Sequence, residues 1–382
     1  EVRFECLRWI ADAVFTSFSA DVERMLTQPD LDYRLFEAAL ATRNTLSGQP
    51  GAAGITNTEV LLEHITNSVT PARLKGYALR LAPASHPKIT VPLLRKLLAV
   101  ADPILSLEVV RNLASRNTDE ANTFLAEIAD SETYATDLRS EAIAGLAGST
   151  KPEHHALLLQ FASHKTVAVR DESLRALRQS PPDAAAQQSL KNVAHHYPES
   201  AALVNAVIDP ASISAGRPAF DDTAAWLKRL DTLPGMPIVE AGRRIFNSNV
   251  AQCTVCHRHS GRGNVNGIGP DLSLIARQGD RIALLRSILE PSRDVAPEFY
   301  PTMLVLENGT VFTGILLSSA DNEIYRDLTG KERTFQLSDI VERNASKTSL
   351  MPSGLVNSLT DGELRDLLAF LSGLGTWALN FL

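Results

Sequence analysis

The residues of this chain best suited to chemistry are two cysteines and a histidine that lie close together. Cys253, Cys256 and His257 form a C-x-x-C-H pattern. This spacing is typical of heme c attachment, in which two thiols form thioethers with the porphyrin vinyl groups and the imidazole binds the iron. A single helical turn would bring both sulfurs and the imidazole to one face of the porphyrin. We therefore predict one covalent heme c here.

A zinc site is the main alternative for the same residues. It would need further cysteine or histidine ligands at compatible spacing. The third cysteine of the chain, Cys6, lies far upstream, and His259 does not complete a familiar ligand set. Heme attachment is therefore the favoured interpretation, and Cys6 is expected to be an ordinary buried thiol.

A downstream loop agrees with this interpretation. Residues 267–272 read G-I-G-P-D-L and resemble the proximal loop of class I cytochromes c. The resemblance implies that the Pro270 carbonyl accepts a hydrogen bond from Nδ1 of His257 and that Leu272 packs against the heme. Orienting a metal-bound histidine through its second nitrogen is a general device.

The second axial ligand is expected further along the chain. Residues 349–355 read S-L-M-P-S-G-L and resemble the segment that carries the axial methionine in the same cytochromes. Met351 is the predicted ligand, because a methionine thioether suits low-spin iron and raises its reduction potential. Methionine more commonly fills a gap in a core, and Met303 is the reserve ligand. Arg277 and Arg281 are candidates for binding the heme propionates.

Two helices are expected to close around the heme. Residues 240–246 form an amphipathic helix that contains the small residue Gly242. Residues 360–371 place leucines at helical spacing, after a capping-box pattern from Thr360 to Glu363. In class I cytochromes c, two such helices cross with a glycine against an aromatic side chain.

Residues 299–345 interrupt this pattern with alternating β-branched and polar residues. Asn308 and Gly309 separate two such runs, which predicts a β-hairpin with a type I′ turn. Four or five short strands are expected, forming a small antiparallel meander or barrel. Nothing in this stretch suggests catalysis.

The ordered motifs resemble the heme-binding domain typical of Planctomycetes and Verrucomicrobia, over about residues 240–373. Besides the segments already described, members share a helix ending in S-I-L-x-P, here residues 287–291, and a D-L-L-A-x-L helix, here residues 366–371. In that family the domain commonly ends a longer polypeptide, after helical repeats and a β-propeller similar to sugar dehydrogenases.

The first half of the chain fits such helical repeats. Residues 2–10 read V-R-F-E-C-L-R-W-I and parallel residues 169–177, V-R-D-E-S-L-R-A-L. One apolar position recurs at intervals of 30, 41, 32, 33 and 31 residues, by subtraction along Ile10, Leu40, Leu81, Leu113, Leu146 and Leu177. This period predicts a HEAT-like α-solenoid, with an irregular helical bundle as the alternative. The longest interval contains residues 47–54, a predicted loop insertion.

The expected fold class is therefore mainly α, with an α-solenoid followed by a cytochrome c-like domain that contains a β insertion. The expected parts are repeats over 1–211, a linker with a short helix over 212–236, the cytochrome domain over 237–298 plus 346–375, and the β-rich insertion over 299–345. Residues 2–10 align with the second helix of a repeat. We therefore expect upstream sequence to cover their apolar face.

Composition limits the function classes. The net charge of −7 argues against nonspecific nucleic-acid binding. No run approaches the ~18 apolar residues of a membrane span. Because bacterial heme c attachment takes place outside the cytoplasmic membrane, we expect a periplasmic or otherwise exported protein.

The predicted function is electron transfer through one low-spin heme with His257 and Met351 as axial ligands. The expected donor is a dehydrogenase, either an upstream domain or a separate protein, and the acceptor is another periplasmic redox protein.

This chain alone is not expected to be an enzyme, although the full-length protein could be a sugar or alcohol dehydrogenase. The alternatives are an open-site heme enzyme or sensor of peroxide or gas, and an interaction scaffold with a vestigial heme. A diheme peroxidase would need a second C-x-x-C-H, which this sequence lacks.

Overall fold

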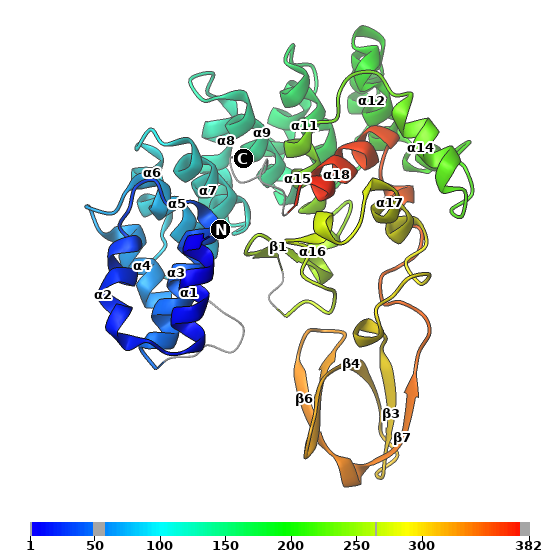
Figure 1. Cartoon of the computed structure of the whole chain (residues 1–382). Helices are drawn as coiled ribbons and strands as arrows, with labels where there is room; N and C mark the ends of the chain where they lie inside the picture. The colour runs from blue at the N-terminus through cyan, green and yellow to red at the C-terminus, as the bar shows by residue number, and fades with distance from the viewer. Residues whose placement is uncertain (1, 49–57, 264–265, 375–382) are drawn as a thin grey trace. The chain divides into compact units, whose positions relative to one another are not determined.

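The computed structural model describes residues 2–48, 58–263 and 266–374, and it is mainly helical with a small antiparallel sheet (Figure 1). This confirms the predicted combination of helices with a β meander. The chain divides into two compact units, the first ending at Leu177 and the second beginning at Arg178. The predicted boundary between residues 211 and 212 therefore falls inside the second unit. No helix among the described residues is long and apolar enough to cross a membrane.

The first unit is a succession of helices of similar length. Their bounds are α1 (Val2–Asp12), α2 (Ser19–Met25), α3 (Tyr33–Leu46), α4 (Thr58–Thr66), α5 (Ala72–Leu81), α6 (Val91–Leu98), α7 (Pro103–Ala114), α8 (Asp119–Asp130), α9 (Thr136–Gly145), α10 (Pro152–Phe161) and α11 (Val167–Leu177). Several begin at a short polar residue, such as Asp32, Asp102 and Thr118, whose side chain accepts a backbone N–H three residues later. Such N-caps satisfy a donor that the first helical turn leaves without a partner.

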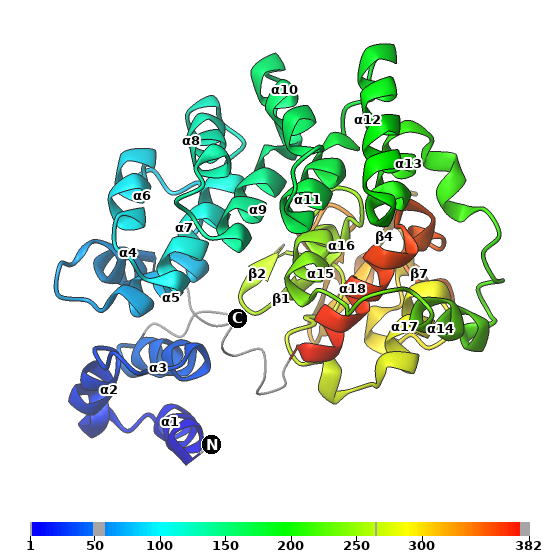
Figure 2. The same cartoon turned by 90° about the horizontal axis from the view of Figure 1, so that it is seen from above.

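The helices of the first unit alternate between two rows. Helices α3, α5, α7, α9 and α11 pack on one another in order, and each also packs on the helix before it. Figure 2 shows α6, α8 and α10 on one side and α7, α9 and α11 on the other. The recurring apolar position lies in or next to the alternate helices and is buried at Leu40, Leu113, Leu146 and Leu177. Residues 49–54 of the expected loop insertion lie outside the described residues.

Buried ion pairs connect these alternate helices. The Glu108 side chain of α7 is 1% exposed, and its Oε1 accepts hydrogen bonds from Nη2 of Arg80 and Nη1 of Arg111, each at 2.9 Å. Nε of Arg111 lies 3.7 Å from Oε1 of Glu141 on α9. Because a buried carboxylate requires paired positive charge, these contacts fix how α5, α7 and α9 stack.

Replacing Glu108 with glutamine should therefore lower the free energy of unfolding by about 3 kcal/mol, the size expected when one partner of a buried pair is removed. Glu127→Gln is the matched control, because Glu127 lies 2.7 Å from Arg95 with both side chains about half exposed. Exposed pairs contribute about 1 kcal/mol or less. Urea denaturation followed by circular dichroism measures both, and equal losses would contradict the assignment.

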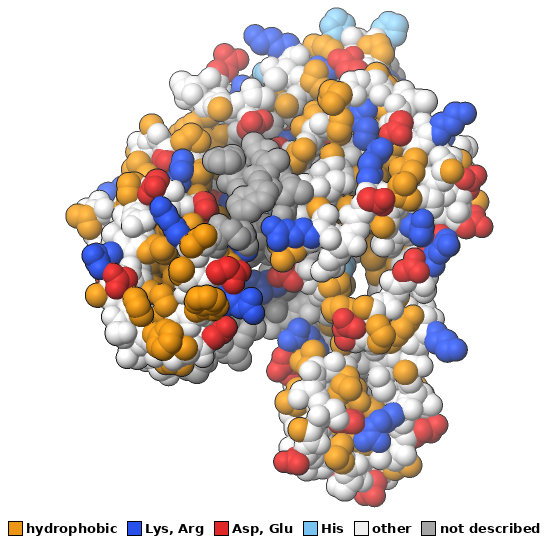
Figure 3. All heavy atoms as spheres, viewed as in Figure 1, with side chains coloured by type: hydrophobic (Ala, Val, Ile, Leu, Met, Phe, Trp, Pro, Cys, Tyr) orange, Lys and Arg blue, Asp and Glu red, His pale blue; other side chains and the backbone are white. Residues whose placement is uncertain are grey.

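The outer face of α1 is exposed. Leu7 is the buried residue of this helix, and its carbonyl accepts a hydrogen bond from Oγ1 of Thr42 on α3 at 3.2 Å. Trp9 is 70% exposed, and Figure 3 shows hydrophobic side chains on the surface of this part of the chain. Cys6 is also exposed, so the expectation of a buried thiol is wrong. The physical reason is that α1 packs on α3 through Leu7, which turns the neighbouring side chain outward.

The second unit combines helices with every strand that the described residues form. Its helices are α12 (Ala184–His196), α13 (Ala201–Ile208), α14 (Thr223–Asp231), α15 (Val239–Phe246), α16 (Cys253–Cys256), α17 (Arg281–Leu289) and α18 (Asp361–Gly373), with 3₁₀ turns that include η4 (Pro210–Ser214), η5 (Ile275–Arg277) and η8 (Leu355–Ser358). Buried side chains of α14, α15, α17, η8 and α18 form one apolar core. Trp226, in the predicted linker of residues 212–236, is fully buried in this core, and its Nε1 donates to the Ala219 carbonyl at 3.0 Å.

The β-rich insertion forms a five-stranded antiparallel sheet. Its strands are β3 (Thr302–Leu306), β4 (Val311–Ser319), β5 (Asn322–Asp327), β6 (Glu332–Gln336) and β7 (Ile340–Ala345), in the order β6-β5-β4-β3-β7. Leu304, Tyr325 and Ile340 form its buried core, against which Phe312 and Phe335 pack. A second, two-stranded ladder pairs β1 (Arg258–His259) with β2 (Arg262–Gly263).

The hairpin between β3 and β4 is present, but the predicted type I′ turn is wrong. A type I′ turn requires positive φ at both central residues, whereas only Gly309 of the pair has one, at +78°. The Gly309 N–H donates to the Leu306 carbonyl, and the Leu306 N–H to the Thr310 carbonyl, each at 2.9 Å. This is a three-residue loop ending in a glycine bulge. The Asn308 side chain accepts the Thr310 N–H at 2.9 Å, which stabilises the longer loop.

Candidate functional site

The C-x-x-C-H segment folds as a single helical turn. Helix α16 spans Cys253–Cys256, and the His257 N–H donates to the Cys253 carbonyl at 2.9 Å. The residue before the turn, Gln252, has a left-handed backbone with φ of +57°. The two cysteines therefore begin and end one helical turn, and His257 follows directly as its C-cap, as the spacing predicts.

Both thiols of this turn are free and partly buried. Burial raises the pKa of the Cys253 thiol to about 12, and it also raises the pKa of Cys256. Desolvation disfavours the charged thiolate, so both sulfurs are held as neutral thiols near pH 7. Cys253 packs against the apolar core of the second unit.

This burial predicts a large difference in reactivity among the cysteines of the heme-free chain. At pH 8 a thiol with the pKa of about 12 given for Cys253 is ionised in roughly one molecule in ten thousand. Cys6 is exposed, and we expect iodoacetamide to label it at least ~100-fold faster, because the thiolate is the reactive form. Peptide mass spectrometry measures the rates, and labelling in urea provides the control. Equal rates in the folded protein would contradict the burial of Cys253.

The expected contact between His257 and the proximal loop is present. Nδ1 of His257 lies 2.9 Å from the Pro270 carbonyl oxygen, so the ring donates from Nδ1 and keeps the Nε2 lone pair available. Burial lowers the pKa of His257, which outweighs the opposing effects of the Pro270 hydrogen bond and of Asp271. A neutral imidazole is the form that binds a metal.

The proximal loop approaches the histidine closely because position 269 is a glycine. A Cβ atom on Gly269 would lie 2.7 Å from Cε1 and 2.8 Å from Nδ1 of His257. The Gly269 N–H donates to the Cys256 carbonyl at 3.0 Å, and the Leu272 N–H to the Arg258 carbonyl at 2.8 Å. These bonds hold the loop against the segment that carries the histidine.

The structure brings Met351, and not the reserve candidate Met303, to the apolar core that Cys253 also contacts. Met351 is half-buried and packs against this core, as does Leu272. Its backbone N–H donates to Oγ of Ser349 at 3.1 Å. Met303 lies on β3 and is 39% exposed.

The two predicted propionate ligands have different surroundings. Arg277 is exposed in η5. Arg281 begins α17, and its Nη1 lies 2.6 Å from Oδ1 of Asp231 on α14. That ion pair competes with any carboxylate that Arg281 would bind.

Helices α15 and α18 cross at Gly242, as the sequence predicts. A Cβ atom there would lie 2.0 Å from the Asp366 carbonyl oxygen and 2.9 Å from Cβ of Phe370. The Asp366 carboxylate accepts the Ile238 N–H at 2.9 Å, at the start of α15. The capping box of α18 is also present, with the Thr360 N–H donating to Glu363 at 2.8 Å.

His259 has a role in packing that the sequence did not indicate. It is 3% exposed, and its ring lies edge-to-face with Phe246 at 5.0 Å and with Phe370 at 5.1 Å between ring centroids. Its Nε2 lies 3.3 Å from the side-chain amide of Asn247. Within the described part of the chain, no group of three or more His, Cys, Asp or Glu side chains could hold a metal ion.

The donor set fits a covalent heme. One helical turn presents Cys253 and Cys256, the imidazole of His257 is neutral with Nδ1 engaged, and Met351 offers a thioether beside apolar side chains. No protein-family model matches this chain, and a search of curated proteins also found no match.

Proposed function

We propose that this chain is an electron-transfer protein that binds one covalent heme c. The single observation that carries the proposal is the 2.9 Å contact between His257 Nδ1 and the Pro270 carbonyl, directly after a turn with two free thiols. This contact selects the tautomer that a metal-bound histidine needs, with the proton on Nδ1 and the Nε2 lone pair available.

The proposed roles follow from the chemistry of each side chain. Cys253 and Cys256 attach the porphyrin, His257 and Met351 bind the iron, and Pro270 holds the imidazole. When bound, the heme iron exchanges one electron at a time between its ferric and ferrous forms. The soft methionine sulfur stabilises the ferrous form and raises the reduction potential.

The apolar surroundings support the same role. Leu272 and Ile275 pack against the core that Met351 also contacts, and such side chains exclude water and favour the less charged ferrous site. We assign residues 237–298 and 346–375 to a class I cytochrome c-like domain of the type found in Planctomycetes and Verrucomicrobia. Its proposed partners are a dehydrogenase donor and a periplasmic acceptor.

The first unit is proposed to be a HEAT-like α-solenoid. The support is the two-row packing of its helices and the burial of four of the six recurring apolar positions, Leu40, Leu113, Leu146 and Leu177. Solenoids present extended surfaces for other proteins, so this unit would hold the electron donor.

Covalent attachment is the decisive test. The protein is produced in a bacterial periplasm together with the heme c attachment machinery, and acidified acetone is used to extract heme that is not covalently bound. We expect the heme to remain with the chain, and the double variant Cys253→Ser/Cys256→Ser to lose it. Cys6→Ser is the matched control and should retain heme. Complete extraction from the unaltered protein would refute the proposal.

A further inference from the structure

The segment that contains Met351 is short and is held at both ends. Before it, the Ser349 N–H donates to Oγ of Ser292 at 3.1 Å. After it, the chain turns at Gly354, where φ is +81°, and enters η8. Only a few residues therefore separate Met351 from a fixed point on either side, and movement of η8 would move the thioether.

An arginine from outside the predicted cytochrome domain binds the end of η8. The Arg217 side chain is 4% exposed. Its Nη1 donates to the Val356 carbonyl at 2.7 Å, and its Nη2 donates to the Leu359 carbonyl at 2.5 Å and to Oδ1 of Asp361 at 2.9 Å. The Val356 carbonyl also accepts the Leu359 N–H at 3.0 Å. A carbonyl oxygen has two lone pairs, so the Arg217 guanidinium adds a second, charge-assisted hydrogen bond to this turn.

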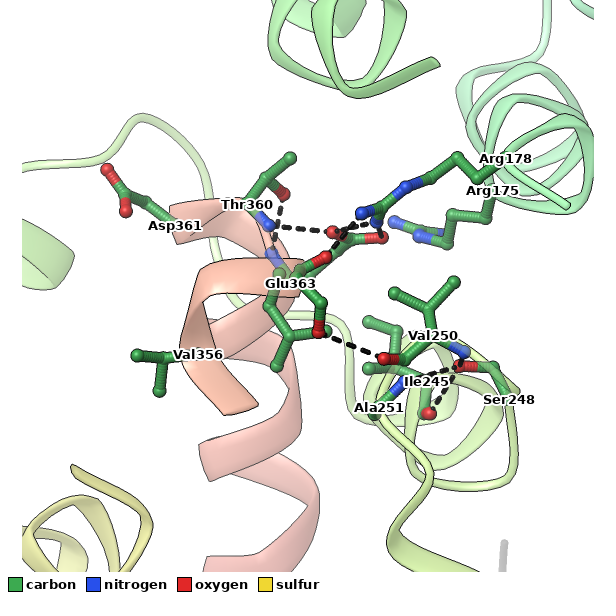
Figure 4. Close-up of polar contacts among 12 residues, drawn as sticks. Arg175, Arg178, Ile245, Ser248, Val250, Ala251, Val356, Thr360, Asp361 and Glu363 are labelled. Atoms are coloured by element: carbon green, nitrogen blue, oxygen red, sulfur yellow. Dashed lines mark hydrogen bonds and ion pairs between the residues drawn. The ribbon is translucent and has the colours of Figure 1, made fainter. Parts of the chain in front are cut away.

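A second arginine binds the same segment. Nη1 of Arg178 lies 2.9 Å from Oε2 of Glu363, and its Nη2 donates to the Ser358 carbonyl. Both side chains are buried, and Glu363 also accepts the Thr360 N–H (Figure 4). Hydrogen bonds that involve charged groups are about twice as strong as neutral ones.

The same segment also contacts the chain just before the heme-attachment turn. Oγ of Ser358 donates to the Val250 carbonyl at 2.9 Å. Arg178 and Arg217 therefore stabilise the backbone of residues 356–359, which follows Met351 in the chain. The same backbone segment is hydrogen-bonded through Ser358 to Val250, three residues before Cys253. Both arginines precede residue 237, so they lie outside the segments that carry the cytochrome-like motifs.

We propose that Arg217 and Arg178 are positioning residues that keep Met351 in place as an axial ligand. This inference rests on the proposed function. It makes residues 178–217 a required part of the heme site, and it predicts that weakening the arginine contacts loosens the methionine without removing it.

The test is the affinity of the ferric protein for added imidazole, which must displace Met351 to bind. Loss of a charge-assisted hydrogen bond corresponds to roughly a tenfold change in an equilibrium constant. We therefore expect Arg217→Gln to bind imidazole roughly tenfold more tightly and to show a weaker far-red absorption band from methionine bound to iron. Arg217→Lys keeps the positive charge but replaces the forked guanidinium with a single ammonium nitrogen, so it should give an intermediate affinity.

Arg365→Gln is the matched control. Arg365 lies on α18, and its Nη1 donates to the carbonyls of Leu233, Pro234 and Gly235 at 3.2, 3.0 and 3.1 Å. Like Arg217 it binds backbone carbonyls, but these lie outside the segment of residues 356–359 that follows Met351. Its imidazole affinity should stay within about twofold of the unaltered protein, because no bond to η8 is lost.

The outcomes separate the two proposals. An unaltered protein without the far-red band would refute His/Met ligation itself. If that band is present but Arg217→Gln and Arg365→Gln bind imidazole equally, the positioning role is overturned. Should Arg217→Gln fail to fold, Arg217→Lys decides by the same criterion, supported by hydrogen exchange of residues 350–359. Faster exchange there in Arg217→Lys is expected, and unchanged exchange with unchanged imidazole affinity would overturn the inference.

Discussion

Replacing Met351 with alanine should lower the reduction potential by on the order of 0.1 V or more, within the ~0.8 V range that axial ligands set. Under the proposed His/Met ligation, the variant loses the thioether that stabilises ferrous iron, and water or hydroxide, both harder ligands, can take its place. Spectroelectrochemical titration measures the potential directly. The ferrous variant should also bind carbon monoxide readily, which the unaltered protein should resist.

Met303→Ala is the matched control for this experiment. Met303 is 39% exposed on β3, so its loss should leave the potential and the far-red band unchanged. If Met351→Ala has the same potential as the unaltered protein, methionine ligation is refuted. An unaltered protein that already binds carbon monoxide tightly would instead support an open-site enzyme or sensor.

Replacing Gly242 with alanine should lower the free energy of unfolding by about 3 kcal/mol, the upper end of the usual range for overpacking. The added Cβ would lie 2.0 Å from the Asp366 carbonyl oxygen and 2.5 Å from its carbon. These are backbone atoms of α18, so no side chain can rotate to make room. The two helices must separate, and the aromatic pair of Phe246 and Phe370, 5.8 Å apart, would separate with them.

Gly362→Ala provides the comparison within the same pair of helices. A Cβ at Gly362 would have its nearest neighbour, Oγ1 of Thr360, at 4.0 Å. Alanine there should be neutral or stabilising by about 0.5–1 kcal/mol, because it reduces the freedom of the unfolded chain. Urea unfolding of the heme-loaded protein measures both variants. A Gly242→Ala protein as stable as Gly362→Ala would show that the crossing is looser than described.

The arginine contacts suggest how the helices before the cytochrome motifs take part in the proposed function. Arg217 and Arg229 both bind the carboxylate of Asp361, at 2.9 and 2.6 Å, at the start of α18. The linker thus contributes a buried positive charge, and α14 a partly exposed one, to the start of α18. A shorter protein without residues 178–236 would remove Arg217 and Arg229 from the half-buried Asp361 and Arg178 from the buried Glu363. Removing the partner of a buried carboxylate is strongly destabilising.

The sequence alone determined the features that depend on local spacing. The C-x-x-C-H turn and the capping box at Thr360 each follow from a few residues and the geometry of one helix. The close approach at Gly242 joins two helices, and it was predicted from the resemblance to class I cytochromes c. The proximal contact of His257 with Pro270 spans 13 residues, and it could be predicted only because a resemblance to class I cytochromes supplied the pairing.

Tertiary structure decided the rest, because it depends on which distant surfaces meet. Cys6 is exposed since its neighbour Leu7 faces α3, and His259 is buried since two aromatic rings converge on it. Arg178 and Arg217 contact η8 and α18 from 139 or more positions away in the chain. A surface arginine and a buried positioning arginine have the same local sequence signal. Only the fold determines which carbonyls each guanidinium reaches.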